Sequence, residues 1–259
     1  MMQHAIVALS VISARELRRF LTQRGRFLSA LVRPLVWLLI FATGFRAALG
    51  VSIIPPYQTY ITYEVYILPG LCGMILLFNG MQSSLSLVYD REVGPMRLLL
   101  TAPLPRWWLL FSKLAAGVLV GVFQVYTFLG IAALFGVSLP ATGYLFILPA
   151  LVSVGLMLGA LGLLLSSVIR QLENFATVMN FVIFPLFFLS SALYPLWRMR
   201  ESSELLYFIC ALNPFSYAVE FIRFSAYLTV APMAIAVVVI SGAAFFLIAN
   251  RLYAATRRG

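Results

Sequence analysis

Apolar residues along this chain occur in long runs, and short polar segments separate them. A helix needs about 20 residues to cross the roughly 30 Å of hydrocarbon in a bilayer. The pattern therefore predicts an all-α polytopic membrane protein with six transmembrane helices. The predicted spans are 31–49, 65–88, 108–135, 144–169, 175–195 and 229–250.

Two of these spans carry an unusual face. Residues at spacings of three, four and seven share one side of a helix. Lipid interacts poorly with polar groups, so we expect the polar stripe of the second span to face protein or a water-filled vestibule. Its role could then be ordinary helix packing or contact with a substrate, and the sequence leaves both alternatives open. The stripe of the second span consists of Asn79, Gln82, Ser83 and Ser86. The comparable aromatic face of the fifth span consists of Thr177, Phe181, Phe184, Phe188 and Ser191.

The connection 89–107 contains the sequence DREVGPMRLLLTAPLPRW. Gly94 and Pro95 end the incoming helix, and Pro103 stops a new one, which leaves a short helix over residues 96–101. Its side chains are too apolar for a free solvated loop. Either the membrane surface or a partner protein is therefore expected to cover them.

The last loop, 197–228, is also more than a linker. Asn213 and Pro214 are a good cap and a good first position for a short helix. The apolar stretches on both sides are too short to cross a bilayer, which predicts a re-entrant hairpin in the outer leaflet. Glu220 and Arg223 are three residues apart and are expected to pair on one helix face.

The N-terminal segment, residues 1–28, is amphipathic. Ala14, Leu17, Leu21 and Leu28 recur at helical spacing, whereas basic residues such as Arg18 occupy the other face. Such a segment predicts an elbow helix in the membrane interface that leads into the bundle, and a simple basic tail is the alternative.

The distribution of charged residues predicts how the chain is oriented in the membrane. Hydrophobic residues make up 63% of the 259 residues, and a net charge of +10 would also suit a nucleic-acid-binding protein. The basic residues, however, flank the apolar runs and form no solvated face, so we expect no nucleic-acid partner. With both termini cytosolic, 14 of the 18 basic residues lie inside, as the positive-inside rule favours. Arg33 and Arg46, near the ends of the first span, are interpreted as headgroup anchors.

The sequence lacks the motifs of several function classes. No G-x-x-x-x-G-K-[ST] sequence occurs, so ATP would have to be hydrolysed by another polypeptide. No Asp or Glu falls in the middle of a predicted span, which disfavours an ion-coupled carrier. No catalytic, cofactor or metal site is expected, because the lone histidine, His4, is part of no cluster with metal spacing. Cys72 and Cys210 both map toward the outer face, and free buried thiols are favoured over a disulfide.

The whole chain resembles the permease subunit of an ATP-binding cassette (ABC) type-2 exporter, a six-span family. The amphipathic N-terminal segment carries this resemblance together with three sequences, DREVGPMRLLLTAPLPRWWLLFSK, FPLFFLSSALYPL and NPFSYAVEFIR. Where the family often has GTxE, this chain has Gly94, Pro95, Met96 and Arg97. The stretches RFLSALVRPLVWLLIFATGFRAALG and YITYEVYILPG also resemble a branch found near quinoprotein alcohol-oxidation systems.

This resemblance implies a transport role. The 89–107 loop would hold a coupling helix that docks on an ATPase subunit, and the second and fifth spans would lie beside the translocation route of an amphiphilic drug, lipid or glycan. Two permeases, identical or different, would pair in the bacterial inner membrane with two ATPase subunits, which alone bind ATP and Mg. The coupling contacts would come from Asp90, Arg91, Glu92, Met96, Arg97, Leu98 and Leu99. A membrane enzyme or scaffold that needs no ATPase is the alternative.

Overall fold

The computed structural model describes residues 2–22, 24–45, 55–57, 61–93, 105–169 and 171–255. The regular elements in these ranges are helices, which agrees with the predicted all-α class. Their bounds are α1 Met2–Thr22, α2 Arg24–Phe45, α3 Tyr63–Val93, α5 Arg106–Leu134, α6 Gly143–Val168, α7 Leu172–Phe188, α8 Leu196–Ser202, α9 Glu204–Leu212, α10 Pro214–Ala226 and α11 Pro232–Ala255.

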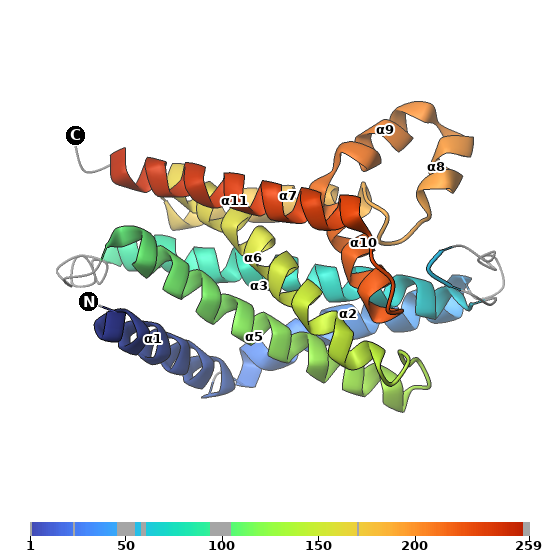
Figure 1. Cartoon of the computed structure of the whole chain (residues 1–259), viewed down its shortest axis with the longest axis horizontal. Helices are drawn as coiled ribbons and strands as arrows, with labels where there is room; N and C mark the ends of the chain where they lie inside the picture. The colour runs from blue at the N-terminus through green and yellow to red at the C-terminus, as the bar shows by residue number, and fades with distance from the viewer. Residues whose placement is uncertain are drawn as a thin grey trace.

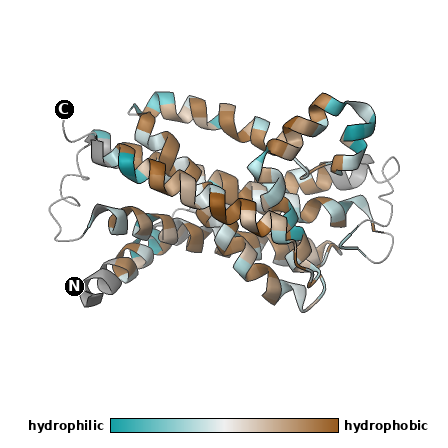
Figure 2. Cartoon of the chain, turned by 45° about the horizontal axis from the view of Figure 1, so that its top comes forward, coloured by the Kyte–Doolittle hydropathy of each residue, from teal (hydrophilic) through white to brown (hydrophobic). Residues whose placement is uncertain are grey.

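The long helices run between the two ends of the molecule (Figure 1). Both chain termini lie at one end, and α8, α9 and α10 lie at the other. Hydrophobic residues follow the lengths of the helices, whereas hydrophilic residues gather toward their ends (Figure 2). This distribution is expected of a bundle whose sides face lipid and whose ends face water.

Among the described residues, four helices are long and apolar enough to cross a membrane by themselves, and the α9–α10 pair makes a fifth if it is one broken span. The apolar part of α2, Leu31–Ile40, and helix α7 are shorter than a full span. The structure thus supports four to five spans by length and composition, whereas the count of six stays a prediction. The four long apolar segments are Tyr63–Tyr89, Trp107–Leu134, Gly143–Val168 and Pro232–Tyr253.

The fifth predicted span, 175–195, is too long at its C-terminal end, because α7 stops at Phe188. A helix leaves its last carbonyl groups without partners inside the helix, so these groups must be satisfied from elsewhere. The side-chain amide of Asn213 supplies two hydrogen bonds, to the oxygen of Leu186 at 2.8 Å and to that of Leu189 at 2.6 Å. The chain then turns toward Pro195, where α8 follows.

Helix α3 lies at the centre of the bundle and packs against α2, α5, α6, α7 and α10. Its contact with α6 is a backbone contact, since a Cβ atom placed on Gly80 would lie 3.0 Å from the Cα atom of Gly159. Its contact with α5 depends on Gly117 and Gly121, which leave room for polar side chains of α3. The Gly-x-x-x-Gly pairs of α5 (Gly117 and Gly121) and α6 (Gly155 and Gly159) therefore pack helices within one chain.

Helix α1 packs mainly against α5. Phe20 is buried and Leu17 half-buried, whereas Ala14, Arg15 and Arg18 are exposed. The predicted segment 1–28, however, is divided, because α2 already begins at Arg24 and therefore includes Leu28. Its location in the membrane interface stays a prediction.

Candidate functional site

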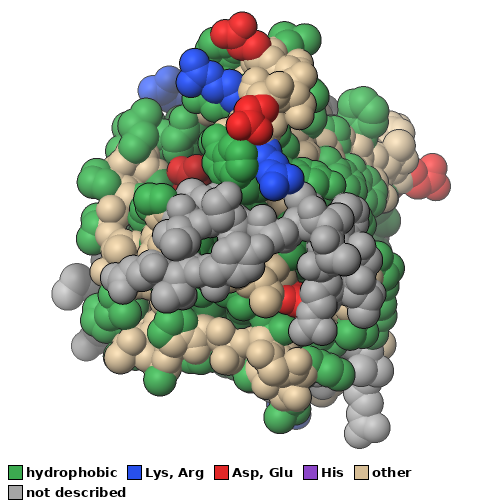
Figure 3. Space-filling view, turned by 90° about the vertical axis from the view of Figure 1, so that its right-hand side faces the viewer, with side chains coloured by type: hydrophobic (Ala, Val, Ile, Leu, Met, Phe, Trp, Pro, Cys, Tyr) green, Lys and Arg blue, Asp and Glu red, His purple; other side chains and the backbone are tan. Residues whose placement is uncertain are grey.

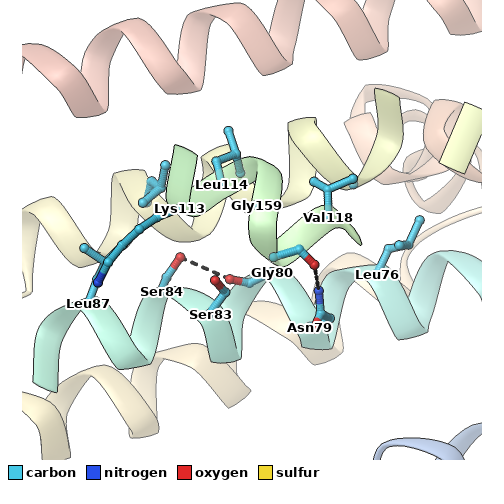
Figure 4. A pocket seen from close by; sticks show the side chains of 13 residues that line it. Leu76, Asn79, Gly80, Ser83, Ser84, Leu87, Lys113, Leu114, Val118 and Gly159 are labelled. Carbon is cyan, nitrogen blue, oxygen red and sulfur yellow. Dashed lines mark hydrogen bonds between the residues drawn. The ribbon is translucent and has the colours of Figure 1, made fainter. Parts of the chain in front are cut away.

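The polar stripe of α3 faces α5. The side-chain nitrogen of Asn79 donates a hydrogen bond to the backbone oxygen of Gly117 at 2.6 Å (Figure 4). Ser83 lies against the same glycine, and the Ser86 hydroxyl donates to the Ser83 carbonyl at 2.7 Å. The stripe therefore faces protein, which was one of the two predicted environments.

A small cavity lies beside Asn79 between α2, α3 and α5, with room for about one water molecule. Gln124 is only 2% exposed, and its Oε1 has no hydrogen-bond partner among the described residues. A buried acceptor without a partner is costly. Water, or a ligand group that donates a hydrogen bond, would therefore be stabilised here. The cavity is lined by Arg33, Pro34, Ile75, Phe78, Asn79, Gln82 and Gln124.

A second cavity, of about 30 Å³, lies on another side of Asn79. Glu16 and Phe20 of α1 line it together with Ser83 and Ser86. The N-terminal helix is therefore part of the wall around the polar stripe.

The predicted aromatic face of α7 is largely exposed on the surface of the chain. Phe181 is 78% exposed, Phe184 43% and Phe188 39%, and Thr177 is also exposed. Ser191 beyond the end of α7 is buried instead. An apolar surface of this kind requires a cover of lipid, of a second chain or of a bound amphiphile.

Phe78 of α3 joins the polar stripe to this aromatic face. Its ring is edge-on to that of Phe184, with 6.5 Å between centroids, and Phe184 in turn stacks on Phe188 at 6.2 Å. The Arg33 guanidinium lies over the Phe78 ring, 3.8 Å from its centroid, in an attractive cation–π geometry. Two predicted groups that are far apart in the sequence are thus connected through the buried ring of Phe78.

The residues at this junction were not predicted as site residues. Arg33 lies two positions inside the first predicted span, and a charged residue inside a span was the available signal. Gln124 is a polar residue inside the third span, which by itself marks a special position. Phe78 has no local signal, because phenylalanine is ordinary in a membrane helix.

The predicted coupling residues are described only in part. Asp90 and Arg91 are in the last turn of α3. Glu92 accepts a hydrogen bond from the backbone nitrogen of Leu172 at 3.3 Å, which ties the end of α3 to the start of α7. The remaining four lie outside the described residues, namely Met96, Arg97, Leu98 and Leu99.

At the opposite end of the bundle, α10 begins as predicted. Asn213 caps the helix by accepting a hydrogen bond from the backbone nitrogen of Phe215 at 2.9 Å, and Pro214 is its first residue. The axes of α9 and α10 differ by 74° at this break. In the view onto this end, charged side chains gather over α8 and α9 (Figure 3), where the sequence has Arg198, Arg200, Glu201 and Glu204.

Arg223 holds α10 against the core. It is buried, its Nη2 donates to the oxygen of Ser191 at 2.9 Å, and its guanidinium lies 4.2 Å from the ring centroid of Tyr66. The pairing of Arg223 with Glu220, one turn earlier, stays a prediction. The anchoring hydrogen bond, however, is with Ser191.

Both cysteines, Cys72 and Cys210, are buried and free, as favoured from the sequence. Within the described ranges, no group of three or more His, Cys, Asp or Glu side chains is placed to hold a metal ion.

Apolar helices of membrane length, packed through glycines and lined inside by a polar stripe, define a polytopic membrane protein of the transport class. Residues 7–227 match the family described as ABC-2 type transporter, and the chain belongs to this family. The resemblance inferred from the sequence is thereby confirmed.

Named relatives agree. The chain is 30% identical over 206 residues to a transport permease, ycf38, of Cyanophora paradoxa, a match that covers 76% of this chain and 66% of the relative. The ycf38 permease of Porphyra purpurea is 30% identical over 200 residues, with the same coverage. A multidrug ABC transporter permease of Escherichia coli K12, YbhR, is 31% identical over 146 residues, or 55% of this chain and 39% of that protein. The match thus spans less than two thirds of the length of these relatives.

Proposed function

We propose that this chain is the permease subunit of an ATP-driven exporter that moves an amphiphilic drug, lipid or glycan-like molecule out of the cytoplasm. The observation that carries this proposal is the row of contacts from the polar stripe of α3, through Phe78, to the aromatic face of α7. A surface that changes from polar to aromatic over one side-chain contact suits a molecule with a polar head and an apolar body.

The proposed topology has six spans and cytosolic termini. Helices α3, α5, α6 and α11 run along the length of the bundle, α2 and α7 cover part of it, and both termini lie at the same end (Figure 1). Tilt and local thinning of the bilayer allow short apolar helices such as α2 and α7 to cross at a modest cost. The distribution of basic residues supports a cytosolic location for that end, and we place the protein in a bacterial inner membrane.

The proposed assembly has two permeases, identical or different, and two ATPase subunits that bind ATP and Mg. A second permease or lipid would cover the exposed phenylalanines of α7. The coupling helix at residues 96–101 would insert Met96 and Leu99 into a groove of the ATPase, with Asp90, Arg91, Glu92 and Arg97 as a polar rim and Leu98 beside them. Buried apolar anchors ringed by charges are typical of such interfaces.

Two charges at the coupling helix test this proposal. In the variant Met96→Asp with Leu99→Asp, each aspartate would be buried without a partner in the ATPase groove, which costs several kcal/mol. We expect the tagged variant to lose co-purification of a subunit that photo-crosslinks to azido-ATP, and to lose export from vesicles. The matched control places the same charges in the loop between α5 and α6 at the other end, as Ser138→Asp with Ala141→Asp, because both residues are exposed there.

The control should insert into the membrane and retain the ATPase. If the wild-type chain captures no ATP-binding subunit, the exporter function is wrong. If the double variant captures it with unchanged affinity, the coupling helix lies elsewhere.

A further inference from the structure

Arg33 holds a positive charge about halfway along the length of the bundle, on its exposed side. Its guanidinium lies over the ring of Phe78, and Phe78 is 11 residues before Tyr89, where the apolar part of α3 ends. At 1.5 Å per residue, this corresponds to about 16 Å along the helix. A side chain that only anchors α2 would extend toward the headgroups instead. A cation at this depth requires a partner or a function.

The surroundings of Arg33 offset its charge only in part. The ring of Phe78 attracts a cation through its quadrupole but carries no net charge. Three amide side chains, those of Asn79, Gln82 and Gln124, line the same cavity, and none of the described residues that line it is acidic. Glu16 lines the second cavity, which Asn79 also borders. The first cavity therefore attracts an anion.

The same cavity also presents hydrogen-bond acceptors. The Oε1 of Gln124 has no partner among the described residues, although the side chain is almost completely buried. One N–H of the Asn79 amide is bonded to Gly117, which leaves its oxygen and its second N–H for a further partner. A ligand that satisfies these oxygens must carry a hydroxyl or amino donor next to its negative charge.

An apolar surface begins directly beside this polar site. Phe78 contacts both Arg33 and Phe184, and the half-exposed rings of Phe184 and Phe188 continue along α7. The polar cavity by itself has room for little more than water, whereas Arg33 and the α7 rings are exposed at its edge. A head at Arg33 and a chain along α7 would therefore occupy one surface.

We infer that Arg33, Gln82 and Gln124 form a recognition site for the head of an anionic amphiphile that carries a hydroxyl or amino donor, with its apolar chain on the aromatic face of α7. That this amphiphile is the exported substrate rests on the proposed function. Binding itself needs no ATPase, so it can be tested on the permease alone.

Trp37 provides a local reporter for the test. It follows Arg33 by one helical turn, and its ring lies 6.0 Å from that of Phe187 and 5.5 Å from that of Phe188. In the full-length chain, the other tryptophans are replaced by phenylalanine, which leaves Trp37 as the single indole. The replaced residues are Trp107, Trp108 and Trp197.

The probe is phosphatidylglycerol brominated in its acyl chains, titrated into phosphatidylcholine nanodiscs that hold this chain. Bromine quenches tryptophan on contact, and this lipid has a phosphate charge beside two hydroxyls. We expect Trp37 to be quenched at a mole fraction at least tenfold lower than with brominated phosphatidylcholine. Brominated phosphatidylmethanol, which has the charge but no hydroxyl, should bind with intermediate affinity. Gln124→Leu should abolish the difference between the two anionic lipids.

The arginine variants decide the role of the charge. Arg33→Gln should remove the preference for anionic lipid, and Arg33→Lys should retain part of it. Arg198→Gln is the matched control, because Arg198 also lies over an aromatic ring, that of Trp197, but at the outer end. The phenylalanine at position 197 in the reporter chain preserves an aromatic ring there. The control should bind like the unchanged reporter protein.

Three results would overturn the inference. Equal quenching by zwitterionic and anionic lipids would show that the site does not select charge. An unchanged preference in Arg33→Gln, with normal Trp37 emission and a monodisperse protein, would leave Arg33 as a simple anchor. Displacement of the lipid by inorganic phosphate would exclude an amphiphile and favour a free anion. None of these results depends on whether an ATPase binds.

Discussion

Asn213 connects two elements with one side chain, and its replacement should be costly. Its oxygen caps α10 through the nitrogen of Phe215, while its nitrogen donates to the oxygens of Leu186 and Leu189 at the end of α7. The residue is only 8% exposed, so water would replace these contacts poorly.

The expected cost of Asn213→Ala follows from these three hydrogen bonds. Loss of a helix cap costs about 1 kcal/mol. Each of the two lost bonds to α7 adds about 0.6–1 kcal/mol, the range found for hydrogen bonds in proteins and between membrane helices. The free energy of unfolding should therefore fall by about 2–3 kcal/mol. It can be measured by steric trapping or by denaturation in mixed micelles.

Two further substitutions separate the contribution of the α10 cap from that of the two hydrogen bonds to α7. Asn213→Ser keeps a capping oxygen, so it should be about 1 kcal/mol more stable than Asn213→Ala. Asn213→Asp also keeps a capping oxygen, but it sets a carboxylate against two carbonyl groups and should be at least as unstable as the alanine variant. Wild-type stability of the aspartate variant, or a loss below about 0.5 kcal/mol for alanine, would refute this account.

Two other predictions concern topology and transport. Single cysteines placed by Ser138→Cys and Arg97→Cys should react with a membrane-impermeant maleimide from the outside and from the inside, respectively; the reverse labelling would contradict the cytosolic termini. Gln82→Ala and Phe184→Ala should each change substrate-stimulated ATP hydrolysis or export while leaving assembly intact, because their side chains lie on the polar-to-aromatic surface. Unchanged transport in both variants would remove this surface from the translocation path.

Features with local causes could be predicted from the sequence. Asn213 and Pro214 begin a helix because a capping side chain and a fixed backbone angle act within a few residues. The stripe from Asn79 to Ser86 lies on one face because helical spacing alone decides it. Glycines at positions 117 and 121 allow close approach wherever their helix packs, and here the approaching helix is α3 of the same chain.

Features that depend on distant partners could not be predicted. The end of α7 is set by Asn213, which is 24 residues after Leu189, so the sequence around Pro185 gave no sufficient signal. The role of Arg33 depends on Phe78, 45 residues later in the chain, and on the cavity between three helices. Such a group becomes visible only when the bundle is assembled.

The glycine contact between α3 and α6 has a mechanical consequence. At Gly80 and Gly159 the two backbones are in contact, so neither helix can slide past the other without a collision. The two helices therefore behave as one rigid unit. The contacts of helices α2 and α7 with it and with each other include aromatic rings, those of Trp37, Phe78 and Phe184, which can rotate against one another at little cost. In a transport cycle, α2 and α7 would therefore move relative to the α3–α6 pair, which would stay fixed.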